Sequence, residues 1–169
     1  MINIKRKLKN FGPLEVLVIS SLLYVLIMLV WTASTRSGVI KKANDIQSNH
    51  EIVVEFINNE VDKCSSDSDG LTAWGENCAS AWTSSQIVKH ILDNFKLNNP
   101  YNIKKPLLQT AEDPRIRAEG KAGQSTDKGI IFVSSSNFDS EAGAEWIIGT
   151  CIKSPCVAAG NNELVSVYR

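Results

Sequence analysis

An almost unbroken run of apolar residues occupies the N-terminal part of the chain, from Phe11 to Trp31. It contains one carboxylate, Glu15, and it is preceded by four cations, Lys5, Arg6, Lys7 and Lys9. From Leu14 onward the run is long enough, at about 1.5 Å of helical rise per residue, to cross most of a ~30 Å hydrocarbon core. The cations predict that the first ten residues stay in the cytoplasm. The pattern therefore predicts one membrane-spanning helix with the remaining chain outside.

After a short polar stretch the apolar residues recur with the period of a helix. They form a stripe of Val39, Ala43, Ile46, Val53, Ile57 and Val61, which Ile40, Val54 and Phe56 widen. Charged residues fill the other faces: Lys41, Lys42, Asp45, Glu51, Glu55, Glu60 and Asp62. This pattern predicts an amphipathic helix whose apolar side packs on a domain core. We expect this amphipathic helix to continue the membrane helix, so that the two form one helix of about 50 residues. We also expect the side chains of His50 and His90 to be exposed to solvent.

A second, shorter helix is indicated by the capping pattern from Thr83 to Gln86, with apolar residues at helical spacing up to Phe95. The following region, 104–128, is polar and interrupted by two prolines, and we expect mainly loop there. Its charges are mixed in sign and lack interleaved aromatic residues, so a solvated loop is favoured over a nucleic-acid contact.

The C-terminal part contains three β-rich runs, at residues 129–133, 145–152 and 163–168, separated by turn-rich stretches. Short connections favour an antiparallel meander. Such a sheet has one apolar face that must be buried, and the apolar stripe of the amphipathic helix can pack against it. The expected fold class is therefore α+β, with a long N-terminal helix packed on a small antiparallel sheet.

Composition narrows the function classes. The chain has 18 basic and 18 acidic residues, a balance that does not indicate nucleic-acid binding. No phosphate-binding glycine loop, nucleophile elbow, Cys-x-x-Cys or paired histidine occurs in the sequence. We therefore expect a protein that is not an enzyme, without catalytic residues, metal or cofactor.

Four cysteines, Cys64, Cys78, Cys151 and Cys156, all follow the apolar run. In an oxidising compartment an even number of cysteines indicates disulfides. Three pairings are possible, and we favour the two local ones, Cys64–Cys78 and Cys151–Cys156.

The first 31 residues fit three explanations. A cleaved secretory signal fits the basic start and the small residues at Thr32–Ser34, although the apolar run is longer than usual. A plain single-pass anchor also fits, with Pro13 at the first helical position and Glu15 as a capping acid at the third.

The third explanation is a resemblance. A basic leader, Phe11, Glu15 four residues later and a continuous apolar run resemble the signal of type IV pilins and their relatives. The resemblance implies cleavage between Asn10 and Phe11 by a prepilin peptidase, and methylation of Phe11. Asn10 stands where that family nearly always has glycine, and Gly12-Pro13 is unusual beside the Phe. Glu15 would pair with the N-terminal amine of a neighbouring subunit and set its register in the filament.

The resemblance also implies a domain plan and a location. Residues 1–10 are a leader, 11–33 the membrane helix and filament spine, 34–63 its amphipathic continuation, and 64–169 a head with two disulfide loops. The expected partners are other pilins, the inner-membrane assembly machinery and the lipid bilayer, and the expected location is the bacterial inner membrane and then an extracellular pilus. The alternatives are a pseudopilin of a type II secretion system and a monomeric, membrane-tethered binding or sensor domain.

Overall fold

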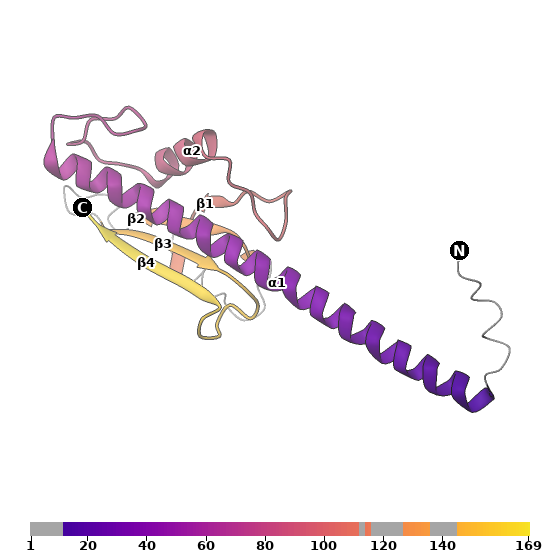
Figure 1. Cartoon of the computed structure of the whole chain (residues 1–169). Coiled ribbons are helices and arrows are strands. Elements are labelled where there is room, and N and C mark those ends of the chain that lie inside the picture. The colour runs from indigo at the N-terminus through magenta and orange to yellow at the C-terminus, as the bar shows by residue number, and fades with distance from the viewer. Residues whose placement is uncertain (1–11, 112–113, 116–126, 136–144) are drawn as a thin grey trace, which may run out of the picture. The chain divides into compact units, whose positions relative to one another are not determined.

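The computed structural model describes residues 12–111, 114–115, 127–135 and 145–169 (Figure 1). Two helices, α1 (Pro13–Ser66) and α2 (Ser84–Asn94), are followed by the strands β1 (Leu108–Thr110), β2 (Ile131–Ser135), β3 (Glu145–Cys151) and β4 (Asn162–Tyr168). An α+β fold with a long N-terminal helix is thus confirmed. The leader and the expected processing residues, Asn10 and Phe11, lie outside the described residues.

The long helix α1 is 54 residues in length and includes both the apolar run and the amphipathic stripe. The contacts of the chain divide it into two units, Met1–Lys41 and Lys42–Arg169, and each is described by itself. In the first unit the apolar side chains from Leu14 to Trp31 are largely exposed, with 76% of Leu14 and 68% of Trp31 accessible. This helix is long and apolar enough to cross a membrane, a test that an N-terminal signal sequence also passes.

The four strands form one sheet in the order β1-β2-β3-β4. Strands β2, β3 and β4 are the expected antiparallel meander, with Val133 opposite Ile148 and Ile148 opposite Val165. Strand β1, however, lies in the region for which we expected mainly loop, and it pairs parallel to β2 from Leu108 to Thr110. The sheet is therefore mixed and not purely antiparallel. The sequence did not indicate β1, because a three-residue strand carries too few residues to show an alternating pattern.

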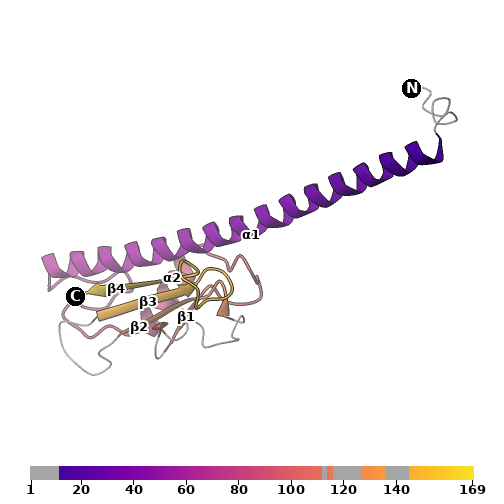
Figure 2. The same ribbon diagram turned by 90° about the horizontal axis from the view of Figure 1, so that it is seen from below.

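In the second unit, the part of α1 from Lys42 onward lies along one face of the sheet (Figure 2). Ile46, Val53 and Ile57 of the predicted stripe are buried against the core, which includes Trp146 and Ile148 of β3. Helix α2 contacts β1 and β2 and buries Ile87, Val88 and Ile91. Val39 and Ile40 of the predicted stripe belong to the first unit, where they are about half exposed, at 53% and 51%.

The N-terminus of α2 is fixed by a complete capping box. The Thr83 hydroxyl accepts from the backbone N–H of Gln86, and the Gln86 side chain accepts from the backbone N–H of Thr83. Two of the N–H groups that a helix start leaves without intrahelical partners are thereby satisfied. The helix begins where the sequence predicted.

Candidate functional site

The carboxylate of Glu15 lies at the third position of α1. The backbone N–H of Gly12 donates to Glu15 Oε2 at 3.0 Å, and the Gly12 carbonyl accepts from the N–H groups of Glu15 and Val16. Pro13 occupies the first helical position, where its missing N–H is not needed. Glu15 therefore acts as the capping acid at the start of the apolar helix, as its spacing from Pro13 predicted.

Hydroxyl groups within and just beyond the apolar run bond to the backbone of the same helix. Ser20 and Ser21 donate to the carbonyls three residues earlier, at 2.9 and 2.8 Å. Thr32, Thr35 and Ser37 make the same kind of contact with carbonyls three or four residues earlier. A hydroxyl satisfied inside its own helix needs no water, which suits a helix in a hydrocarbon environment.

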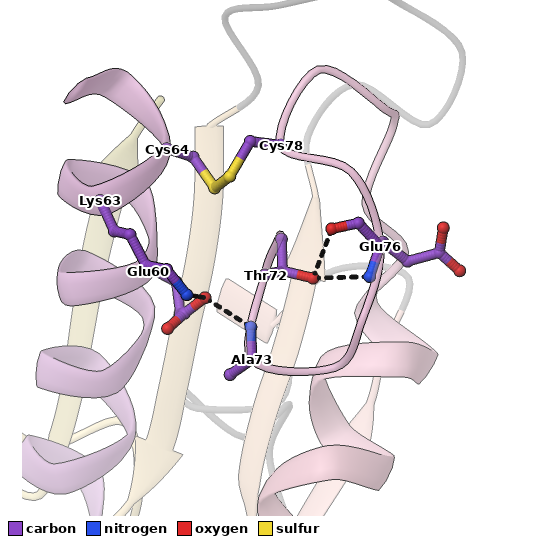
Figure 3. A network of polar contacts seen from close by, with 7 residues as sticks. All are labelled: Glu60, Lys63, Cys64, Thr72, Ala73, Glu76 and Cys78. Atoms are coloured by element: carbon purple, nitrogen blue, oxygen red, sulfur yellow. Dashed lines mark hydrogen bonds and ion pairs between the residues drawn. A yellow bond between two sulfur atoms is a disulfide. The ribbon is translucent and has the colours of Figure 1, made fainter. Parts of the chain in front are cut away.

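The two local disulfides favoured from the sequence are present. Cys64 bonds to Cys78, and Cys151 to Cys156, with Cα atoms 5.1 and 5.3 Å apart. The first bond joins the last turns of α1 to the loop that follows (Figure 3). The second lies where β3 ends. Both pairs are buried, and Cys64 and Cys78 belong to the apolar core.

A short polar network orders the loop between Cys64 and Cys78 (Figure 3). Glu60 of α1 accepts from the backbone N–H of Ala73 at 2.7 Å, and Lys63 Nζ lies 3.7 Å from the same oxygen. The Thr72 hydroxyl accepts from the N–H of Glu76 at 3.0 Å. The sequence placed Glu60 on a face other than the apolar stripe, yet only 8% of this residue is exposed. Its burial is compensated by the amide that it accepts.

An aromatic cluster includes one residue of this loop, Trp74. Its rings are Trp74 and Trp82, with centroids 5.0 Å apart, together with Phe56, Phe95 and His90. The His90 ring stacks on Phe56 at 5.6 Å with an interplanar angle of 14°. His90 is half-buried, so the expectation of a solvated side chain is wrong.

The second histidine, His50, is buried between α1 and the sheet, and here too the expectation of a solvated side chain is wrong. Only 2% of His50 is exposed. Its Nε2 lies 3.3 Å from the carbonyl oxygen of Ile148 in β3, and its Nδ1 lies 3.1 Å from Glu163 Oε2 in β4. A signal for this burial was present in the sequence. The predicted stripe has an interval of seven between Ile46 and Val53, and position 50 fills it with spacings of four and three.

Burial changes the acid–base behaviour of this pair. Desolvation lowers the pKa of His50 from its usual 6.5, against the opposing effects of the Ile148 carbonyl and the Glu51 charge. Desolvation, followed by the charge of Glu51, raises the pKa of Glu163 above its usual 4.5, against the opposing effect of a hydrogen bond from the Gln47 side chain. Both shifts favour the neutral form of the side chain.

In the part of the chain that the structure describes, no group of three or more His, Cys, Asp or Glu side chains is arranged to hold a metal ion. Comparison with known proteins gives no relative. No family model matches the chain, and no curated protein or solved structure is significantly similar to it.

Proposed function

We propose that this chain is a structural subunit of a type IV pilus-like filament. Before assembly, its apolar helix anchors it in the bacterial inner membrane, with the N-terminus in the cytoplasm and the disulfide-bonded head in the periplasm. The observation that carries this proposal is the exposed apolar run of α1, from Leu14 to Trp31, which contains a single carboxylate, Glu15, within one turn of the helix start.

The carboxylate is the informative part of that helix. An acid close to a membrane interior is costly unless it has a partner, and such acids usually serve a function. In a filament, the partner would be the N-terminal amine of a neighbouring subunit, after cleavage between Asn10 and Phe11. The charge pair would then set the axial position of each subunit as it leaves the bilayer.

The head is consistent with exposure outside the cytoplasm. Two disulfides, Cys64–Cys78 and Cys151–Cys156, persist best in an oxidising compartment. The packing of the C-terminal part of α1 on an antiparallel meander also agrees in outline with the layout of the pilin family. A pseudopilin of a secretion system shares these features and belongs to the same proposal.

A specific contact favours a second candidate, a monomeric membrane-tethered binding or sensor domain. Glu15 already accepts from the N–H of Gly12 in its own helix, so a cap alone accounts for an acid at this position. In that case the carboxylate needs no neighbouring subunit and the leader stays attached.

Two substitutions separate these candidates. Glu15→Ala removes both the cap and the charge, whereas Glu15→Gln removes the charge and keeps a side chain that caps a helix at this position. We expect both variants to reach the membrane and neither to enter filaments. Ser20→Ala, which removes a self-satisfied hydroxyl within the apolar run, serves as the control and should assemble as wild type.

Mass spectrometry of the N-terminus provides the independent readout. A chain that begins at methylated Phe11 supports the filament subunit, and an intact Met1 supports the tethered domain. Incorporation of Glu15→Gln at the wild-type level would show that capping suffices and that the carboxylate does not set the register.

A further inference from the structure

The contact between His50 and Glu163 joins three elements of the second unit. His50 projects from α1, its Nε2 meets the Ile148 carbonyl of β3, and its Nδ1 meets the Glu163 carboxyl of β4. We propose that His50 and Glu163 share one proton, which is held on the carboxyl group. This proton allows His50 of α1 to hydrogen-bond to both β3 and β4 at once. The inference concerns the head alone and does not depend on the proposed function.

The two contacts of the His50 ring require a proton between His50 and Glu163. The Ile148 carbonyl can only accept, so Nε2 must carry a hydrogen, and in a neutral imidazole this is the only N–H of the ring. Nδ1 is then a bare acceptor, 3.1 Å from Glu163 Oε2. An ionised carboxylate is also only an acceptor, and two acceptors at that distance repel each other. Both contacts of His50 are satisfied together only when a proton lies between Nδ1 and the carboxyl oxygen.

The surroundings decide which partner holds the proton. His50 is buried, and an ion pair withdrawn from water costs free energy, so the neutral acid and the neutral imidazole are favoured over carboxylate and imidazolium. The pKa directions agree with this choice: burial lowers the pKa of the imidazole, and burial followed by the charge of Glu51 raises the pKa of the carboxyl. The groove beside them is lined by Glu51 and Glu55 from α1 and Glu163 from β4, and β3 offers the Ile148 carbonyl. Its described lining includes no lysine or arginine, so the contact that favours an ionised Glu163 is the hydrogen bond from the Gln47 side chain, a neutral group.

Loss of the proton has a defined structural consequence. Once Glu163 is ionised, the imidazole moves its hydrogen to Nδ1 in order to donate to the carboxylate. Nε2 then faces the Ile148 carbonyl without a hydrogen, and the contact between α1 and β3 is lost. Because 26% of the Glu163 side chain is exposed, solvent can exchange this proton without opening the core.

Nitrogen NMR of the full chain in detergent micelles tests the proposal directly. The chain has only two histidines, so His90→Gln leaves His50 as the one labelled ring. Between about pH 5 and about pH 9 we expect a change from the Nε2–H to the Nδ1–H tautomer as Glu163 ionises. The amides of β3 should exchange roughly five- to tenfold faster after the change, relative to their intrinsic rates, as expected for one lost buried hydrogen bond.

Two variants serve as the matched comparison. Glu163→Gln replaces the acid with an amide whose N–H donates to Nδ1 at every pH, so it should hold the Nε2–H tautomer and abolish the change. Glu55→Gln removes a carboxylate from the same groove without touching His50, and it should keep the wild-type response.

Three results would overturn the proposal. One is an Nδ1–H tautomer in the wild-type protein across the whole range, and another is an imidazolium at neutral pH. The third is a wild-type response in a folded Glu163→Gln variant. If that variant does not fold, the tautomer of the wild-type ring still decides.

Discussion

The carboxylate of Glu60 and the backbone N–H of Ala73 form a 2.7 Å hydrogen bond that joins α1 to the loop closed by Cys64 and Cys78. Glu60 is buried, and its partner lies 13 residues away in a loop without helix or strand of its own. The bond therefore positions the loop on the helix in addition to the covalent bond nearby.

Replacing Glu60 with alanine should lower the free energy of unfolding by about 1–3 kcal/mol, because the amide of Ala73 loses its acceptor. Glu60→Gln should cost less, since its amide oxygen can still accept. Urea denaturation followed by tryptophan fluorescence measures both. Asp62→Ala, an exposed acid in the same helical turn, is the control and should change stability little. An equal loss for Asp62→Ala would show that the effect belongs to helix charge and not to the bond.

The two disulfides should differ in what they contribute. Cys64 and Cys78 are 14 positions apart, whereas Cys151 and Cys156 are 5 apart. On the chain-entropy model, the paired alanine replacements should cost about 3 kcal/mol for the longer loop and about 2 kcal/mol for the shorter. The midpoint of thermal unfolding, measured for each double variant, gives the order. A larger loss for the shorter loop would mean that native packing outweighs chain entropy here.

The pH dependence of stability should have two opposing parts. The pKa of His50 is lowered in the folded protein. The contribution of His50 to the free energy of unfolding is therefore present above pH 6.5, its usual pKa, and is lost as the pH falls below that value. The pKa of Glu163 is raised in the folded protein. Its contribution to the free energy of unfolding is therefore present below pH 4.5, the usual pKa of the group, and is lost as the pH rises above that value. In the wild-type protein the two slopes partly cancel between these values.

Single substitutions should separate the two slopes. With His50→Gln, which retains an N–H for the Ile148 carbonyl, stability should fall as the pH rises above 4.5. With Glu163→Gln, it should fall as the pH drops below 6.5. Urea midpoints in a series of buffers measure both, with His90→Gln as the control that keeps the wild-type profile. Slopes of the same sign in the two variants would contradict the assigned pKa directions.

Arg169 stacks on the aromatic cluster. Its guanidinium carbon lies 4.2 Å from the centre of the Trp82 ring, and its Nη1 donates to the Ser80 carbonyl at 3.0 Å. Arg169→Ala should cost about 1–2 kcal/mol, and Arg169→Lys should recover only part of this because a lysine lacks the planar fork. Tryptophan-monitored unfolding measures the loss, with the exposed Lys153→Ala as control. If Lys153→Ala has the same effect, general charge and not stacking is responsible.

Several elements follow from local pattern alone. The start of α1 at Pro13, the capping box at Thr83 and the three strands of the meander depend on residues close together in the sequence, whose side-chain period or hydrogen-bonding pattern defines the element. The disulfide pairing followed from separations short enough to favour local closure.

Strand β1 could not be predicted in this way. Its three residues, Leu108 to Thr110, form a strand because β2 lies beside them and accepts parallel pairing. The backbone partners come from more than twenty positions further along the chain, and nothing in the local composition indicates them.

The sequence by itself determined that the chain has an apolar helix with Glu15 at its third position, followed by an amphipathic stripe and a small sheet. The spacing of the stripe admits His50 to the apolar face, but only the tertiary structure decided that the polar side chains of His50 and Glu60 are buried there. Burying a polar side chain costs free energy unless a hydrogen-bonding partner is present at the buried site. Those partners are the Ile148 carbonyl, 98 positions from His50, and the Ala73 amide, 13 positions from Glu60 in an irregular loop.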